Sequence, residues 1–139
     1  MKKLITFGVI LGLSLLIASC GGGGGGGGAS TSINVTMTDF QFTPRTFTVP
    51  AGKEITLNAV NNGARRHNFV IMKLGQTAGD KFDDQDVPNV FWQVEVNSGE
   101  STSATFTAPT EPGSYQVLCK TPGHLTAGMT ATLTVIAGQ

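Results

Sequence analysis

Three side chains that bind metals lie close together near the C-terminus of this 139-residue chain. Four residues separate Cys119 from His124, and four more separate His124 from Met129, so one segment carries a thiol, an imidazole and a thioether. The other histidine of the chain is His67. Thiolates and thioethers are soft ligands and imidazole binds many transition metals, so these four residues are candidates for one metal site.

The elements expected around these residues allow the four donors to meet. Cys119 ends one predicted strand and Met129 directly precedes another, and a Pro-Gly pair between them predicts the turn that carries His124 back toward the sulfur. His67 directly precedes a third predicted strand. It would therefore supply the fourth donor from a distant part of the chain.

Two imidazole nitrogens, one thiolate and a weak axial thioether are the ligand set of a blue-copper site. A thioether is a poor ligand for zinc. With four protein ligands, no position stays open for substrate or water, so outer-sphere electron transfer is expected and catalysis is not. The sequence thus predicts one copper ion held by His67, Cys119, His124 and Met129 in a protein that is not an enzyme.

Other functions could use some of the same residues. A nucleophilic enzyme would need Cys119 open to substrate and an oxyanion site, and it leaves Met129 unexplained. An extracytoplasmic copper carrier or metallochaperone could hold Cu(I) with the same soft ligands. A metal-free adhesive domain would leave all four donors without a role. Copper titration with optical spectroscopy separates these alternatives.

The remaining sequence predicts an all-β domain over residues 33–139. Short apolar or alternating runs are separated by turn-forming residues, and no segment has a convincing helical period. Seven to eight such strands favour a Greek-key β-sandwich or barrel. A polar stretch at residues 73–89 is expected to be a long surface connection with one helical turn. Strands are predicted at residues 33–37, 47–49, 55–60, 68–71, 91–96, 104–106, 115–119 and 130–136.

The first 32 residues are expected to lie outside this domain. Residues 1–19 combine a basic start with an apolar run typical of a signal peptide. The small residues before Cys20 resemble the lipobox of bacterial lipoproteins, which predicts a lipid anchor on Cys20 at the extracytoplasmic (periplasmic) face of the membrane. The alternative is an ordinary signal peptide that leaves Cys20 as an incidental thiol. Residues 20–32, with eight consecutive glycines, then predict a flexible tether.

Composition and cysteine usage narrow the function further. Nine basic and nine acidic residues balance, whereas nucleic-acid binding normally uses a basic stripe. We therefore expect that the protein does not bind nucleic acid. We also expect it to be a monomer. Lipidation of Cys20 would leave Cys119 without a disulfide partner in an oxidising compartment, which favours a metal role for its thiol.

With these motifs in place, residues 33–139 resemble the cupredoxins, the type 1 blue copper proteins. The spacing from Cys119 through His124 to Met129 is similar to that of azurins and auracyanins, whereas plastocyanins typically have two residues between the cysteine and the second histidine. The segments HNFVIM at 67–72, FTAP at 106–109 and PGSY at 112–115 add to the resemblance. Together with the lipobox and the glycine run, they are most similar to the auracyanins of filamentous anoxygenic phototrophic bacteria.

The resemblance implies further roles. Asn68 would brace the cysteine loop by hydrogen bonds. Pro122, Leu125 and Ala127 would form an apolar docking surface around His124, whose ring edge would be the electron port. A membrane quinol-oxidising complex would be the electron donor, and cytochrome c or a reaction-centre cytochrome the acceptor. Service to a respiratory oxidase is the alternative.

Two positions depart from the family pattern. Lys120 replaces the Ser or Thr that often follows the cysteine, which leaves open whether Asn68 finds a hydroxyl partner and whether the cation favours the reduced metal. Arg66 replaces the glycine that precedes the first histidine of azurins, so an azurin-like carbonyl contact to copper is also open. Arg65 and Arg66 either help to select an anionic partner or form a solvated turn.

Overall fold

The computed structural model of the protein describes residues 28–138. The predicted signal peptide, the predicted lipid anchor Cys20 and most of the predicted tether lie outside these residues. Within the described range, no helix has the length and apolar character needed to cross a membrane.

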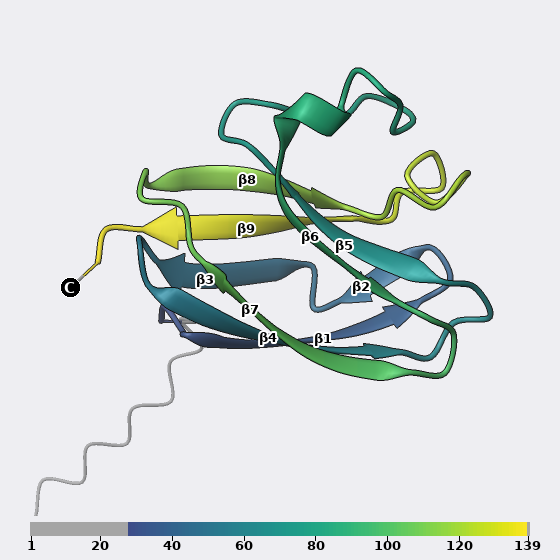
Figure 1. Ribbon diagram of the computed structural model, residues 1–139, viewed down its shortest axis with the longest axis horizontal. Helices are drawn as coiled ribbons and strands as arrows, with labels where there is room; N and C mark the ends of the chain where they lie inside the picture. Colours follow the sequence, from purple (N-terminus) through teal and green to yellow (C-terminus); the bar gives the residue numbers. More distant parts are fainter. Residues whose placement is uncertain (1–27, 139) are drawn as a thin grey trace, which may run out of the picture.

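Two β-sheets pack face to face in the described part of the chain (Figure 1). One sheet has the strand order β2-β1-β4-β7 and the other the order β3-β9-β8-β5-β6. The predicted all-β Greek-key sandwich is confirmed, with nine strands in residues 28–138 where seven to eight were expected. They are β1 (Ser32–Thr38), β2 (Gln41–Thr43), β3 (Thr46–Pro50), β4 (Glu54–Asn61), β5 (His67–Met72), β6 (Val90–Val96), β7 (Ser101–Thr107), β8 (Gly113–Leu118) and β9 (Thr130–Ile136).

The main core lies between the two sheets. Buried residues alternate along β4, as a strand with one solvated face requires. Phe42 from the first sheet and Phe47 from the second both contact Phe69 edge to face, with ring centroids 5.7 and 5.5 Å apart. Complete burial of one such ring contributes roughly 1.5–3 kcal/mol, so these contacts help to hold the sheets together.

The strand that the sequence pattern did not predict is β2, which pairs with the end of β1. Its central Phe42 is fully buried, whereas Gln41 and Thr43 are exposed. One apolar residue between two polar ones is too short a pattern to indicate a strand. The turn that joins β1 to β2 consists of Asp39 and Phe40.

Strand β5 is buried on both faces. One face contributes to the main core, and the other belongs to a smaller apolar group that we call the outer cluster. The predicted connection at residues 73–89 helps to cover this outer face and contains the expected helical turn as the 3-10 helix η1 (Val87–Asn89). It is therefore a packed layer as well as a polar surface. The outer cluster comprises Val70, Met72, Ala78, Leu118 and Leu125, with Phe82 and Val90 packed against it.

The chain enters the sandwich at one end, and β8 ends and β5 begins at the other end (Figure 1). At one end, the N–H of Ser30 donates to the carbonyl of Thr48 at 2.9 Å, so contacts with the domain begin slightly before residue 33. At the other end, β1 and β8 finish and β5 begins. His67 and Cys119 therefore lie at the end remote from the entry of the chain.

Candidate metal centre

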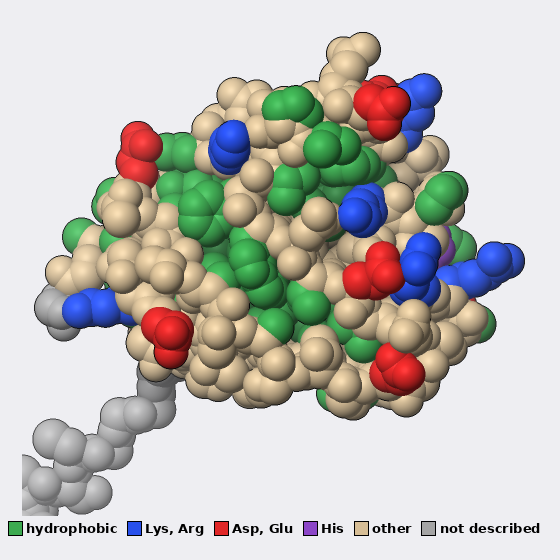
Figure 2. All heavy atoms as spheres, in the orientation of Figure 1, with side chains coloured by type: hydrophobic (Ala, Val, Ile, Leu, Met, Phe, Trp, Pro, Cys, Tyr) green, Lys and Arg blue, Asp and Glu red, His purple; other side chains and the backbone are tan. Residues whose placement is uncertain are grey.

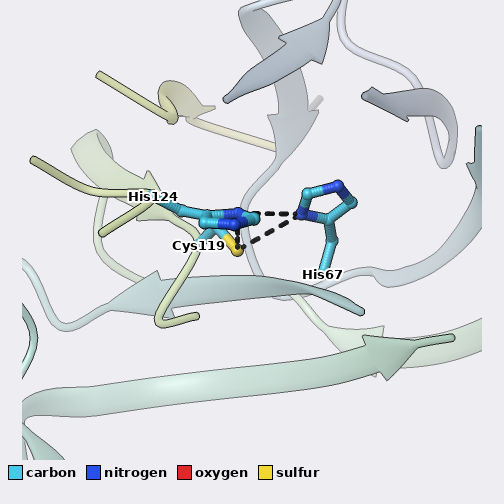
Figure 3. Close-up of side chains that lie close together, drawn as sticks. All are labelled: His67, Cys119 and His124. Carbon is cyan, nitrogen blue, oxygen red and sulfur yellow. Dashed lines mark hydrogen bonds between the residues drawn. The ribbon is translucent and has the colours of Figure 1, made fainter. Parts of the chain in front are cut away.

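Three of the four predicted donors lie together at this remote end (Figure 3). His67 is the first residue of β5, Cys119 directly follows β8, and His124 lies in the turns between β8 and β9. The Sγ atom of Cys119 is 3.7 Å from Nδ1 of each histidine, and the two Nδ1 atoms are 3.1 Å apart. His67 and Cys119 are 0% exposed and His124 is 5% exposed. The structure thus brings His67 to the distant cysteine segment, as the sequence predicts.

These separations fit a single metal ion. By plane geometry, the point equidistant from the three atoms lies about 2.0 Å from each. Protein zinc sites have metal–nitrogen bonds of about 2.0–2.1 Å and metal–sulfur bonds of about 2.3 Å, so an ion fits after a small adjustment at the sulfur. When both imidazoles carry their proton on Nε2, their Nδ1 lone pairs repel across 3.1 Å, and a cation between them removes this repulsion.

Backbone hydrogen bonds fix the segment that carries Cys119, His124 and Met129. The N–H of Met129 donates to the carbonyl of His124 at 2.9 Å, and the N–H of Cys119 donates to the carbonyl of Met129 at 3.2 Å. Gly123 and Gly128 have φ values of +84° and +89°, which larger residues rarely adopt, so the glycines let the segment turn. Met129 is fully buried, and its backbone is hydrogen-bonded to both Cys119 and His124. Its thioether as the fourth ligand stays a prediction.

Asn68 contacts the cysteine segment in two ways. Its N–H lies 3.5 Å from the Sγ atom of Cys119, and its side-chain oxygen lies 3.2 Å from the hydroxyl of Thr121. The hydroxyl partner that Lys120 left open is therefore supplied by the next residue. The same hydroxyl lies 2.8 Å from the carbonyl oxygen of Arg66, so the group that could form an azurin-like contact is hydrogen-bonded to the loop.

Comparison with known proteins agrees with this geometry. Residues 29–136 match the copper binding proteins of the plastocyanin/azurin family. The chain belongs to this family. Its resident metal is copper, and among cupredoxins it is most like the auracyanins. The crystal structure of dithionite-reduced auracyanin from the photosynthetic bacterium Roseiflexus castenholzii has a TM-score of 0.66 and 33% sequence identity, and the match covers 78% of this chain and 99% of that chain.

Two curated relatives extend the comparison. Auracyanin-B of Chloroflexus aurantiacus is 36% identical over 110 residues, which cover 68% of this chain and 46% of that protein. The copper-resistant cuproprotein CopI of Rubrivivax gelatinosus is 33% identical over 112 residues, which cover 75% of this chain and 66% of that protein. This cupredoxin thus spans about half the length of auracyanin-B and just under two thirds of CopI.

Burial favours the neutral form of both histidines in this cupredoxin. Desolvation lowers the pKa of His67 below 6.5, the neighbouring His124 lowers it further, and Asp39 opposes both effects. Desolvation also lowers the pKa of His124, with Asp39 opposing and Arg65 reinforcing the shift. Neutral imidazole is the form that binds a metal, so both rings are ready to act as ligands near pH 7.

The predicted docking surface has two exposed residues among its three. Pro122 and Ala127 are exposed beside the nearly buried His124. Leu125, the third residue predicted for docking, is only 8% exposed and packs in the outer cluster, so it offers almost no surface to a partner. Phe40 is 49% exposed instead, and its ring contacts His124 edge to face with centroids 5.1 Å apart. On the face drawn in Figure 2, a small area of histidine is visible at the right-hand end beside Lys and Arg side chains.

Charged side chains beside the centre are held by polar partners. The ammonium of Lys120 donates to the side chain of Gln93 at 2.7 Å. The guanidinium of Arg66 pairs with one oxygen of Glu95 at 3.0 Å, and the other oxygen accepts from the Asn68 amide at 3.0 Å. Because the Arg66–Glu95 pair is well exposed, it contributes little to stability, and Glu95 links Arg66 to the Asn68 side chain.

Two residues that the sequence pattern did not predict lie beside His67. The Oδ1 atom of Asp39 lies 3.2 Å from Nε2 of His67. Gly63 lies against the same pair, because a Cβ atom built on it would stand 2.6 Å from Oδ1 of Asp39 and would overlap Nε2 of His67. Asp and Gly are common turn residues, so neither position carries a local signal of contact with a distant histidine.

Proposed function

We propose that this protein is a blue copper electron carrier, anchored through Cys20 at the extracytoplasmic face of the membrane. The observation that carries the proposal is the buried triangle of His67 Nδ1, His124 Nδ1 and Cys119 Sγ, whose separations match one metal ion. Met129 would supply the weak fourth ligand. Copper, when bound, supplies a one-electron couple between Cu(II) and Cu(I).

The protein's own residues hold the donors and exclude water. His67 belongs to a strand that is buried on both faces, and the donors of the cysteine segment are tied together through Met129. These contacts restrict changes in ligand position, which keeps the structural reorganisation small during electron transfer. The burial of all three donors leaves no room for a substrate, which supports outer-sphere transfer and not catalysis.

Electrons would enter and leave through His124, the donor nearest to the surface. Phe40, Pro122 and Ala127 provide the exposed apolar rim around it. A small apolar contact of this kind suits partners that must dissociate quickly. Arg65, which is close enough to influence the pKa of His124, would favour acidic groups on the partner.

For partners, we propose a membrane quinol-oxidising complex as donor and cytochrome c or a reaction-centre cytochrome as acceptor. This assignment extends the resemblance to auracyanins, one of which comes from a photosynthetic bacterium. Stopped-flow mixing with a purified complex of each kind tests it. Rapid reduction by the first and rapid oxidation by the second are expected, both slower at high salt because the rim charge of Arg65 is screened. Oxidation by a respiratory oxidase alone would refute the photosynthetic assignment.

Copper titration with optical spectroscopy tests the centre itself. The metal-free protein should bind one equivalent of Cu(II), develop an intense thiolate-to-copper charge-transfer band and lose it reversibly on reduction. Cys119→Ser should abolish the band. Met129→Leu should change the spectrum and the reduction potential, whereas Met37→Leu, at an equally buried methionine of the main core, should leave both unchanged. A protein that stays colourless with Cu(II) contradicts the proposal.

A copper carrier is the second candidate, because one relative, CopI, is by its name a copper-resistant cuproprotein. Carriers exchange metal through exposed coordination, whereas the donors here are buried. The two functions differ in how fast the loaded protein releases copper. Retention of Cu(I) against a competing chelator for hours, together with rapid electron exchange, supports the electron carrier. Release within seconds would favour the copper carrier.

Incorporation of labelled fatty acid tests the anchor. The wild-type chain should be labelled and should sediment with membranes, and Cys20→Ala should remove both properties. An unlabelled wild-type chain would support cleavage of an ordinary signal peptide.

A further inference from the structure

We propose that Asp39 is a positioning residue for the copper centre: its carboxylate holds the Nε2 proton of His67, so that Nδ1 faces the other donors, and its charge favours Cu(II) over Cu(I). This inference rests on the proposed function. It assigns a role in the centre to the turn between β1 and β2, which supplies none of the predicted ligands.

The position of the proton on His67 decides which ring nitrogen can bind the metal. A neutral imidazole carries its proton on one ring nitrogen and offers a lone pair on the other. Nδ1 of His67 faces Cys119 and His124, so the proton belongs on Nε2. That atom is fully buried, and within the described residues it has no well-aligned hydrogen-bond acceptor. A buried N–H of this kind requires a partner.

The carboxylate of Asp39 is the partner of this N–H group. Oδ1 of Asp39 lies 3.2 Å from Nε2 of His67, within the distance range of an N–H···O bond. The oxygen lies off the line of the N–H bond, which makes the contact bent. Because the Asp39 side chain is 36% exposed, a small rotation of its carboxylate can align the two groups. Carboxylates commonly orient metal-bound histidines through the second ring nitrogen in this way.

A neighbouring loop holds the Asp39 carboxylate in place. The N–H of Ala64 donates to both oxygens of Asp39, at 3.1 and 3.3 Å. Asn61 holds the loop around Ala64, because its amide donates to the carbonyls of Arg65 and Val96 at 2.8 and 2.9 Å. The oxygen of the same side chain accepts the backbone N–H two residues later at 2.9 Å. The loop is thus built to fix Asp39 against His67.

The negative charge of Asp39 also acts on the centre. Asp39 brings a negative charge to the outer edge of a buried imidazole, and partial burial weakens its screening by solvent. A negative charge stabilises the more positive oxidation state. A hydrogen bond from Nε2 to a carboxylate also makes Nδ1 a stronger electron donor. Both effects favour Cu(II), so loss of Asp39 should raise the reduction potential.

The test compares Asp39→Asn and Asp39→Ala with Glu54→Gln. Glu54 is exposed at the start of β4, at the opposite end of the sandwich, so its variant removes the same charge without touching the centre. Reduction potentials are measured by spectroelectrochemistry and Cu(II) dissociation constants by chelator competition. In the Cu(I) protein, ¹H–¹⁵N spectra of His67 report whether Nε2 carries a slowly exchanging proton.

Both Asp39 variants should shift the Cu(II)/Cu(I) equilibrium toward Cu(I) by about tenfold, which is about 59 mV for one electron. Asp39→Ala should also weaken Cu(II) binding by ten- to 100-fold and speed exchange of the Nε2 proton. Asp39→Asn retains an acceptor oxygen and should lose less affinity. Glu54→Gln should match the wild type in all three measurements.

Unchanged potential and copper affinity in Asp39→Asn would overturn the inference, and this variant decides the matter if Asp39→Ala does not fold. A proton on Nδ1 of His67 in the wild-type Cu(I) protein would overturn it as well. A wild-type protein that binds no copper would instead refute the proposed function, so the two failures are distinguishable.

Discussion

Replacing Gly63 with alanine tests whether the loop beside His67 shapes the metal centre. The added Cβ would stand 2.6 Å from Oδ1 of Asp39 and would overlap Nε2 of His67, whereas ordinary contacts begin at 3.4 Å. The loop or the imidazole must therefore move by about 0.8 Å or more. Metal–ligand distances tolerate changes of only about 0.2 Å, so copper affinity should fall by at least about tenfold, or about 1.4 kcal/mol.

The same change should destabilise the metal-free protein by about 1–3 kcal/mol, because overpacking strains neighbouring groups. Gly79→Ala is the matched control, since a Cβ atom there meets nothing within 4 Å. We expect the control to be neutral or more stable by up to about 1 kcal/mol, because alanine restricts the unfolded chain. Chelator competition and thermal unfolding supply the two measurements. If Gly63→Ala binds copper as tightly as the wild type, the close approach does not constrain His67.

Further changes test other parts of the structure. Because burial lowers the pKa values of His67 and His124 below 6.5, the unfolded chain takes up protons first as the pH falls through 6.5. The metal-free protein should therefore unfold at a lower temperature at about pH 5 than at about pH 7.5. If a variant that lacks both imidazoles shows an equal drop in unfolding temperature, the two histidines are not the cause. Thr121→Val should lower the free energy of unfolding by about 1 kcal/mol and shift the reduction potential, because two acceptor oxygens lose their contact with the hydroxyl. Thr121→Ser keeps the hydroxyl and should have the wild-type stability and potential. An unchanged potential in Thr121→Val would show that the hydroxyl does not orient the loop. Phe42→Ala should lower the free energy of unfolding by about 3–5 kcal/mol in urea titrations, because the ring is fully buried. Phe40→Ala should have a small effect, because the ring of Phe40 is half exposed. Similar losses of stability in both variants would contradict the assignment of the core.

The candidate ligands could be predicted because three of the four lie in one short segment of the sequence. Cys119, His124 and Met129 occupy one segment with regular spacing, and the strands around them have clear alternation. His67 needed only to begin a strand paired with β8, and such pairing brings the start of one strand to the end of its antiparallel neighbour.

Contacts that depend on packing were not predictable. Leu125 belongs to a segment without periodic pattern, so the sequence did not show that this side chain faces the outer cluster. Asp39 reaches His67 only because β2 reverses the chain after a two-residue turn. Thr121 supplies the hydroxyl that is missing at Lys120, and this contact depends on the three-dimensional course of the loop.

The placement of chain entry and copper centre at opposite ends of the sandwich has a consequence for reach. With an attachment at Cys20, the domain would be held at one end, and the electron port at His124 would lie at the other end. Tilting about the attachment point would sweep that port through an arc across neighbouring complexes, while the immediate surroundings of the copper stayed the same. Shortening the glycine run should therefore narrow the range of complexes that can be served without changing the reduction potential.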